Sequence, residues 1–276
     1  MSRLTVVVDN SVTPASLLLG EHGLSMWLEH QGVNLLYDTG RGRALLPNLE
    51  ALNLDPAALD AVVLSHGHYD HSGGLAELLK LRGRPTPVWC HPAAFGLHLK
   101  QYRDGQTKEI GPLLSQAQYQ DLGAVFRWAR GNSQPWPGVT LLTDIPRRTA
   151  FEAPAPELLT RRGDALIPDP LEDDLALLVL GTKGPAVLTG CAHAGALNVL
   201  AAAREAAGRP PALLAGGTHL GPAPADQQEA SLKALAAAPG LQVAAGHCTG
   251  LSMAGRLQAA LGPRFRHLEA GRVLEL

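Results

Sequence analysis

The sequence is poor in cysteine, in aromatic residues and in long apolar runs. Three cysteines among 276 residues are too few for the disulfide framework of a small secreted protein and are typical of a reducing compartment. No apolar run approaches the roughly 20 residues that a membrane-spanning helix needs. The N-terminus enters a strand-like segment without the apolar region of a signal peptide. We therefore expect a cytoplasmic protein with no membrane partner.

An excess of charge of one sign is also missing, because the formal net charge is −2 at pH 7. The arginines are scattered apart from two short pairs, Arg147-Arg148 and Arg161-Arg162. A nucleic-acid-binding groove normally shows as a basic stripe, so we expect no nucleic-acid partner. The apolar share of 46% is typical of a globular protein, and the length suits one large α/β domain or two small ones.

Potential metal ligands are concentrated in residues 61–75, which read AVVLSHGHYDHSGGL. The apolar residues 61–64 predict a short buried strand, and the apolar periodicity after the two glycines predicts a helix. Four ligand-type side chains lie between these elements, within six positions: His66, His68, Asp70 and His71. Imidazole nitrogens and carboxylate oxygens are the ligands that borderline metals such as Zn²⁺ prefer. The stretch therefore predicts a metal site.

The spacing of these four residues predicts which of them bind the same metal ion. His66 and His68 lie two positions apart on extended backbone, so both can face one metal ion. Asp70 and His71 lie where the chain turns into the helix, so they can face a second ion. The alternative is a polar loop with solvated histidines. Four ligand-type residues between a strand and a helix argue against it.

The motif HGHYDH resembles the HxHxDH signature of the metallo-β-lactamase superfamily. Within that superfamily the chain is similar to a branch of metal-dependent hydrolases that includes archaeal dihydropterin ribofuranosyl-aminobenzene phosphate synthases and bacterial relatives. The resemblance implies a single domain over residues 1–276, folded as a four-layer αββα sandwich. The alternation of strands and helices by itself indicates only an α/β fold.

The rest of the pattern divides into two strand-rich halves. Strands are predicted at 4–9, 24–28, 32–37, 87–90, 174–181, 185–189, 211–217 and 241–245, and helices at 92–100, 195–207, 224–238 and after 255. Between the halves, residues 102–170 are rich in Gly, Pro and polar residues but also carry tryptophans, which predicts a loop-rich insertion near the site. This insertion is a candidate cover for the site or a candidate contact of a homodimer, and the sequence leaves both open.

Further site residues are expected at the ends of other strands. His193 follows a strand and precedes a helix, as the first cluster does, and is predicted as a third imidazole ligand. The resemblance assigns the last metal-binding histidine to His247. It also assigns to Asp38 the aspartate that supports the metal-binding histidines through hydrogen bonds. In this branch His219 resembles a site residue that contacts substrate or transfers a proton. His91 and His98 are expected to be structural.

Two residues bear on which metal and which substrate are bound. Most superfamily members carry a metal-bridging aspartate where this chain has Cys191, which is either a thiolate ligand favouring zinc or iron over manganese or a small buried core residue. We expect one or two divalent ions, with zinc first and iron or manganese as alternatives. Arg147 lies in GVTLLTDIPRRTAFE, which resembles a stretch of the branch. Its guanidinium is predicted to bind an anionic substrate group, and the alternative is an ordinary surface arginine.

Together these residues predict a metal-dependent, phosphoesterase-like hydrolase acting on a small anionic substrate, a phosphoester or a pterin-like molecule. Metal coordination lowers the pKa of bound water to roughly 7, and Asp70 is predicted to orient the resulting hydroxide or to accept its proton. The metals also neutralise charge that develops on the attacked group. Two alternatives stay open: an iron-dependent oxygenase or redox protein on the same fold, and a non-catalytic metal-binding protein.

Overall fold

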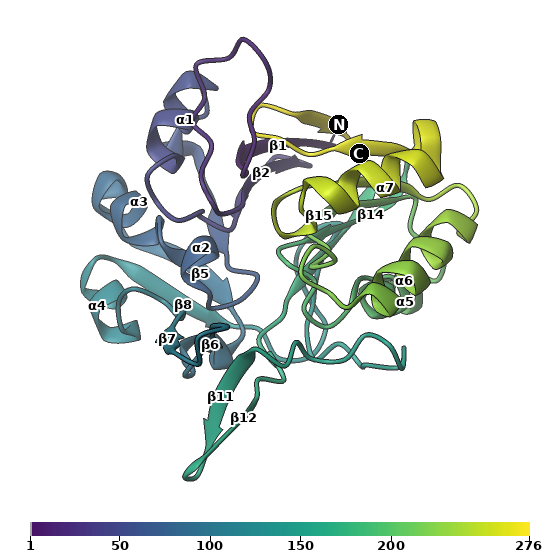
Figure 1. The fold of residues 1–276 in the computed structure, drawn as a ribbon. Helices are drawn as coiled ribbons and strands as arrows, with labels where there is room; N and C mark the ends of the chain where they lie inside the picture. Colours follow the sequence, from purple (N-terminus) through teal and green to yellow (C-terminus); the bar gives the residue numbers. More distant parts are fainter. Residues whose placement is uncertain (1) are drawn as a thin grey trace.

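The computed structural model describes residues 2–276, which form two seven-stranded β-sheets packed face to face (Figure 1). The first sheet consists, in spatial order, of β18 (Val273–Glu275), β1 (Ser2–Val8), β2 (Ser25–His30), β3 (Val33–Tyr37), β4 (Ala61–Val63), β5 (Thr86–Cys90) and β8 (Ala124–Trp128). The second sheet consists of β17 (Phe265–His267), β16 (Gln242–Ala245), β15 (Leu213–Gly216), β14 (Gly184–Thr189), β13 (Ala176–Gly181), β10 (Val139–Leu142) and β9 (Ser133–Trp136). A small third sheet consists of β12 (Ala165–Pro168), β11 (Leu158–Arg162), β6 (Leu99–Gln101) and β7 (Thr107–Glu109).

Helices cover the outer faces of the two large sheets. They are α1 (Leu45–Ala51), α3 (Leu75–Arg82), α4 (Gln116–Asp121), α5 (Ala196–Ala207), α6 (Ala225–Ala237) and α7 (Leu251–Leu261), whereas the short α2 (Tyr69–Ser72) lies in the connection after β4. Alternation along β1 shows the layering: Leu4 and Val6 pack between the sheets, whereas Val7 packs with α1, α3 and α4. The helices α5, α6 and α7 pack against the second sheet. The predicted four-layer αββα sandwich is therefore confirmed.

The strands that carry the site are parallel. β3, β4 and β5 run parallel in the first sheet, and β14, β15 and β16 run parallel in the second. Because the carboxyl ends of parallel strands lie at one edge of a sheet, the loops that follow them are neighbours. Among residues 2–276, no helix combines the length and the apolar character needed to cross a bilayer.

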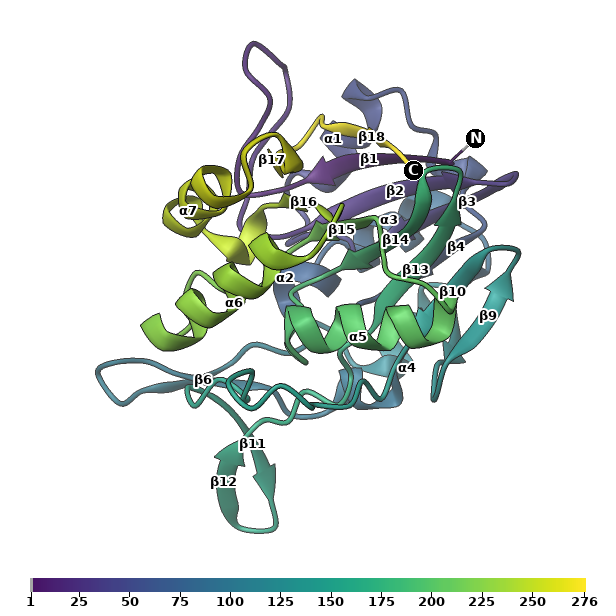
Figure 2. The ribbon, with the colours of Figure 1, turned by 90° about the vertical axis from the view of Figure 1, so that its right-hand side faces the viewer.

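Two predictions in the middle of the chain are wrong. The helix expected at 92–100 is only a 3-10 turn, Pro92–Phe95, after which β6 begins. The segment 102–170 is not one insertion, because it supplies β8 to the first sheet and β9 and β10 to the second. These strands are only four or five residues long and lie among Gly, Pro and polar residues. For this reason the sequence pattern did not predict them. What projects beyond the sandwich is the small sheet, whose β11–β12 hairpin stands out in Figure 2.

Candidate metal centre

The ligand-type side chains gather where the parallel strands of both sheets end. Each strand is followed by part of the set: Asp38 after β3, His66, His68, Asp70 and His71 after β4, Cys191 and His193 after β14, His219 after β15 and His247 after β16. All of these except His219 are buried, and His219 is partly buried. α2 begins directly after His68 and carries Asp70 and His71. The fold therefore brings together every metal ligand that the sequence predicts.

Three imidazoles form the first group, which we call the three-imidazole group: His66, His68 and His193. Their candidate ligand atoms lie within 4.8 Å of one another, and His66 Nε2 is 3.0 Å from His68 Nδ1. The Nε2 atom of His193 is buried with no hydrogen-bond partner among residues 2–276. Burial, together with the neighbouring imidazoles, holds the pKa of each of the three histidines well below its usual range. The rings are therefore neutral and present lone pairs, as metal ligands must.

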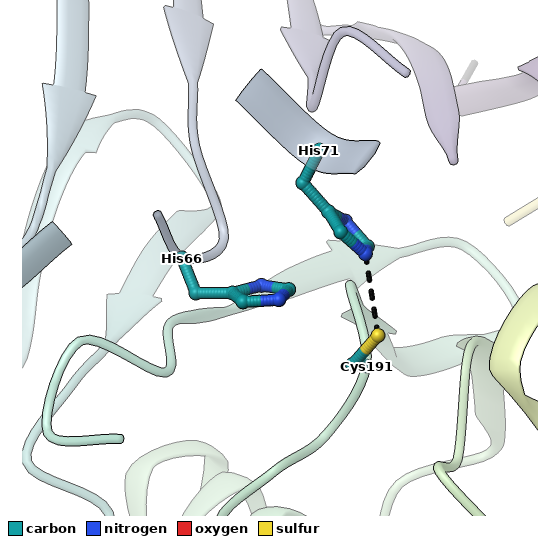
Figure 3. A group of neighbouring side chains, drawn as sticks. All are labelled: His66, His71 and Cys191. Atoms are coloured by element: carbon teal, nitrogen blue, oxygen red, sulfur yellow. Dashed lines mark hydrogen bonds between the residues drawn. The ribbon is translucent and has the colours of Figure 1, made fainter. Parts of the chain in front are cut away.

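A second set of donors, the mixed group, comprises Asp70, His71, Cys191 and His247. His71 Nε2 lies 3.1 Å from His247 Nε2, 3.2 Å from Cys191 Sγ and 3.8 Å from Asp70 Oδ2. Asp70 Oδ2 is 3.4 Å from His247 Nε2. Figure 3 shows His66 and His71 pointing from the first half of the chain toward Cys191 in the second. Ligands placed tetrahedrally around zinc lie roughly 3.3–3.8 Å apart, which is close to these four separations.

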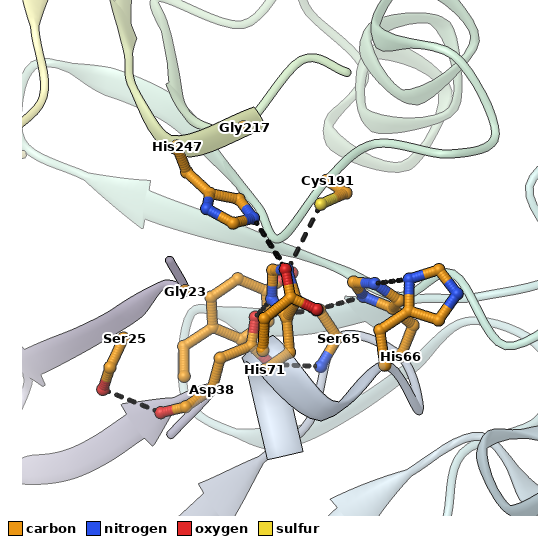
Figure 4. A network of polar contacts seen from close by, with 12 residues as sticks. Gly23, Ser25, Asp38, Ser65, His66, His71, Cys191, Gly217 and His247 are labelled. Atoms are coloured by element: carbon orange, nitrogen blue, oxygen red, sulfur yellow. Dashed lines mark hydrogen bonds and ion pairs between the residues drawn. The ribbon is translucent and has the colours of Figure 1, made fainter. Parts of the chain in front are cut away.

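Asp38 fixes the orientation of His71. The Asp38 carboxylate is fully buried and accepts hydrogen bonds from His71 Nδ1, Ser65 N and Ser65 Oγ, each at 2.7 Å. With its proton on Nδ1, His71 directs the lone pair of Nε2 toward the mixed group. Figure 4 shows Asp38 on one side of His71 and His247 and Cys191 approaching from the other. This is the contact that the sequence predicts for Asp38.

Two adjacent carboxylates hold the loops of the three-imidazole group, and the sequence prediction missed both. Asp173 Oδ2 accepts a hydrogen bond from Gly67 N at 2.7 Å, between the two histidines of the motif. Asp174 Oδ2 accepts one from Ala194 N, also at 2.7 Å, directly after His193. Both carboxylates are buried. One short segment before β13 therefore ties together the backbone of both ligand loops.

The side chain of Arg147 has partners other than those the sequence predicts. Its guanidinium donates to the backbone carbonyls of His193 at 2.7 Å, Pro170 at 2.9 Å and Glu152 at 3.3 Å. It is absent from the residues that line the cavities beside the histidines. In this structure Arg147 holds the loop that carries His193 and does not face a substrate cavity.

A cavity of about 190 Å³ opens beside both groups of ligands. It is lined by His22, His68, Tyr69, Asp70, Lys100, Tyr102, Ile110, Leu158, Cys191, His193, His219, Pro222, His247 and Cys248. A neighbouring cavity of about 490 Å³ shares His193 and His219 with it. His219 therefore lines both cavities, as expected of the substrate-contacting residue that the sequence predicts. His91 and His98 belong to no ligand group among residues 2–276.

Three further residues at this cavity were not predicted from the sequence to belong to the site. His22 Nε2 lies 3.2 Å from Asp70 Oδ2, and its side chain is 51% exposed. Lys100, on β6, is the lysine that lines this cavity. Cys248 lies beside Cys191 and His219. Cys248 could have been predicted as a site residue, because it directly follows His247 in the sequence. No motif in the sequence points to His22 or Lys100.

Comparison with known proteins agrees with this geometry. The family model of the Metallo-beta-lactamase superfamily matches residues 19–247. The 7,8-dihydropterin-6-methyl-4-(beta-D-ribofuranosyl)-aminobenzene-5'-phosphate synthase of Methanocaldococcus jannaschii is 26% identical over 264 residues, which cover 92% of this chain and 90% of that protein. The structure of Tm1679, a metal-dependent hydrolase of the beta-lactamase superfamily, matches with a TM-score of 0.84 and 25% identity over 100% of this chain and 99% of the other. Zn²⁺-bound PqqB from Methylobacterium extorquens, with a TM-score of 0.57 and 12% identity over 99% of this chain and 100% of the other, shares the fold. The chain belongs to the metallo-beta-lactamase superfamily.

Proposed function

We propose that this protein is a metal-dependent hydrolase that uses metal-activated water on a small anionic phosphoester. One observation carries the proposal: two sets of metal-ligand atoms face the same cavity, which also presents a lysine. The two sets are adjacent, because the ring centroids of His66 and His71 are 4.2 Å apart. Neighbouring metal sites with an open side are the usual arrangement for hydrolysis of phosphoesters.

The residues that would hold the ions follow from the geometry. His66 Nε2, His68 Nδ1 and His193 Nε2 are the donors of the three-imidazole group. Asp70, His71, Cys191 and His247 are those of the mixed group. The thiol favours zinc, with iron as the alternative. When bound, divalent ions supply Lewis acidity and lower the pKa of coordinated water to roughly 7.

Asp70 is the residue that we assign to orient the attacking water. Burial alone would raise the pKa of its carboxyl, but His71 and His247 outweigh burial and hold the pKa well below its usual range. The carboxylate is therefore ionised at neutral pH and accepts a hydrogen bond or a proton. His22 Nε2, 3.2 Å away and half exposed, gives that proton a route to solvent.

Lys100 and His219 are assigned to the substrate. The Lys100 ammonium at the cavity attracts an anionic group, which is the role that the sequence predicts for Arg147. His219 lies on the wall between the two cavities, where its imidazole can donate a proton to a leaving oxygen. The archaeal relative is named for a dihydropterin-containing 5'-phosphate, so a pterin-like phosphoester is the first substrate to test.

The experiment is a chelation and reconstitution series on the purified protein. Activity on a chromogenic phosphodiester and on pterin phosphoesters is measured before chelation, after chelation and after addition of zinc, manganese or iron. We expect turnover that is lost on chelation, restored by metal and absent in His68→Ala. Turnover that persists after chelation or in His68→Ala would contradict the proposal.

A second candidate function, an iron-dependent oxygenase or redox protein, is favoured by one observation. Cys191 Sγ lies 3.2 Å from His71 Nε2, which places a soft donor at the mixed group. Oxygen consumption by iron-loaded protein, without hydrolysis of any ester, would support this candidate. Tight metal binding with neither activity would instead support a non-catalytic metal-binding protein.

A further inference from the structure

We propose that Cys191, His219 and Cys248 form a further binding site for a thiophilic metal ion, the thiol site, which shares Cys191 with the hydrolytic centre. The Sγ atoms of the two cysteines and a ring nitrogen of His219 lie within 4.8 Å of one another. The three residues follow three neighbouring parallel strands, β14, β15 and β16. Binding at this site needs no turnover, so the inference goes beyond the proposed hydrolase activity.

The backbone is arranged to let the two sulfur atoms approach. A Cβ atom at Gly217 would lie 2.4 Å from Gly190 O, 2.5 Å from Cys248 Sγ and 3.3 Å from Cys191 Cα, so glycine here leaves room both for the backbone after β14 and for the Cys248 thiol. His219 N donates a hydrogen bond to Cys248 Sγ at 3.2 Å, which orients the sulfur. On the ring of His219, Nδ1 is a buried atom without a hydrogen-bond partner among residues 2–276. An unpaired buried nitrogen beside two thiols is explained by a cation that it binds.

The donor set selects the kind of ion. Two thiols and an imidazole suit soft or borderline ions such as Zn²⁺, Cd²⁺ or Cu⁺, whereas Mn²⁺ and Mg²⁺ prefer oxygen. Two cysteines and one histidine with a fourth, open position are an established zinc ligand set. All three residues line the cavity of about 190 Å³, which supplies the open position. On binding, sulfur–metal bonds form and the thiol protons pass to solvent.

Cys191 connects this thiol site with the mixed group. Its Sγ lies 3.2 Å from His71 Nε2 and also within the thiol site. The other two ligands of the thiol site, His219 and Cys248, lie outside both groups assigned to the hydrolytic centre. Cys248→Ser therefore removes the thiol site without changing a residue assigned to hydrolysis. His219→Ala also removes the residue assigned to donate a proton, so its effect is read from cadmium binding and not from turnover.

The experiment is a titration of metal-free protein with Cd²⁺ under anaerobic, reducing conditions. The readouts are the ultraviolet thiolate-to-cadmium absorption band and the bound cadmium counted by elemental analysis. We expect Cys248→Ser to bind one fewer cadmium ion and to lose roughly half of the band, because one of two thiolate ligands is missing. We expect His219→Ala to bind cadmium at the thiol site more weakly, which shifts the titration to higher concentration.

Two controls separate this proposal from the hydrolase proposal. Cys90→Ala removes the one other cysteine, which is buried on β5, and is expected to leave the band unchanged. His68→Ala is expected to abolish turnover and to keep the band. An undiminished band and cadmium count in both Cys248→Ser and His219→Ala would overturn the thiol site. A band that disappears in Cys191→Ala but keeps its full intensity in Cys248→Ser would also overturn it, because Cys191 would then serve the mixed group alone.

Discussion

The three-imidazole group and the mixed group differ in how the fold holds them. The first consists of one ligand type, and its two loops are tied to the same buried segment by Asp173 and Asp174. In the second, imidazoles, a carboxylate and a thiol come together from the three connections that follow β4, β14 and β16. There the support comes from side chains: Asp38 holds His71, and Asn10 Oδ1 accepts a hydrogen bond from His247 Nδ1 at 2.9 Å.

This difference affects how each group responds to mutation and to the choice of metal ion. Backbone tethers set the positions of the ligand loops before any ion binds, so the three-imidazole group is preorganised. The mixed group has one partner, His22, that is half exposed, and a sulfur that the thiol site shares. We therefore expect the first group to be more selective and more sensitive to mutation, and the second to tolerate change and accept several metals.

Replacing His66 by alanine is expected to have the largest effect, because this ring touches both groups. Its centroid is 4.8 Å from that of His193 and 4.2 Å from that of His71. We expect the metal content of both groups to fall and activity to be lost, a larger effect than the roughly 10–100-fold cost of removing a supporting residue. Elemental analysis after dialysis measures the metal content. His30→Ala removes a buried histidine that bonds to Ser2 instead and serves as the control.

Asp173→Asn is expected to weaken only the three-imidazole group. The amide keeps the shape of the side chain but loses the charge that holds Gly67 N, so zinc affinity at that group should fall by roughly 10–100-fold. Competition with a chromogenic chelator measures the two affinities separately. Asp164→Asn, an exposed change on the turn between β11 and β12, is the control. Equal weakening of both groups would mean that Asp173 stabilises the whole fold, and that the two groups are not held independently.

The parts of the site that the sequence predicts are those with a local pattern. His66, His68, Asp70 and His71 lie within one strand–helix connection, and His193 and His247 each follow an apolar run that proved to be a strand. The four layers of the fold were predicted from the resemblance to the metallo-β-lactamase superfamily, because the alternation of strands and helices by itself indicates only an α/β fold.

The parts that the sequence could not show depend on contacts between distant residues. Gly67 and Asp173 are 106 positions apart, and the Asp173-Asp174 pair alone does not reveal which backbone it holds. The same holds for Lys100, which lines the cavity because β6 pairs with β11. β8, β9 and β10 are too short for their periodicity to stand out among turns. These features depend on tertiary packing.

Lys100→Met tests whether the open side of the centre selects anionic substrates. Loss of a charged hydrogen-bond partner costs about 1.5–3 kcal/mol, so KM for a phosphomonoester or phosphodiester should rise at least about tenfold. The KM for a neutral ester of similar size should stay within about twofold, since neutral groups gain little from a nearby ammonium. Lys108→Met is the matched control, because Lys108 lies on the neighbouring strand β7 over the same Tyr102 ring but does not line the cavity. Equal changes in both variants would remove Lys100 from the substrate site.

His22→Ala is expected to have the smallest effect and tests the tolerance of the mixed group most directly. The imidazole lies 3.2 Å from Asp70 Oδ2, but half of the side chain is exposed, so water can take its place. We expect the metal affinity of the mixed group to change by no more than about threefold, the range of an exposed ion pair. The rate of turnover at saturating substrate should fall more than the affinity does, since His22 is assigned to carry the proton from Asp70 to solvent. Addition of imidazole to the assay should restore part of that rate. A loss of metal as large as that in His66→Ala would instead make His22 a ligand, and the mixed group would then be no more tolerant than the three-imidazole group.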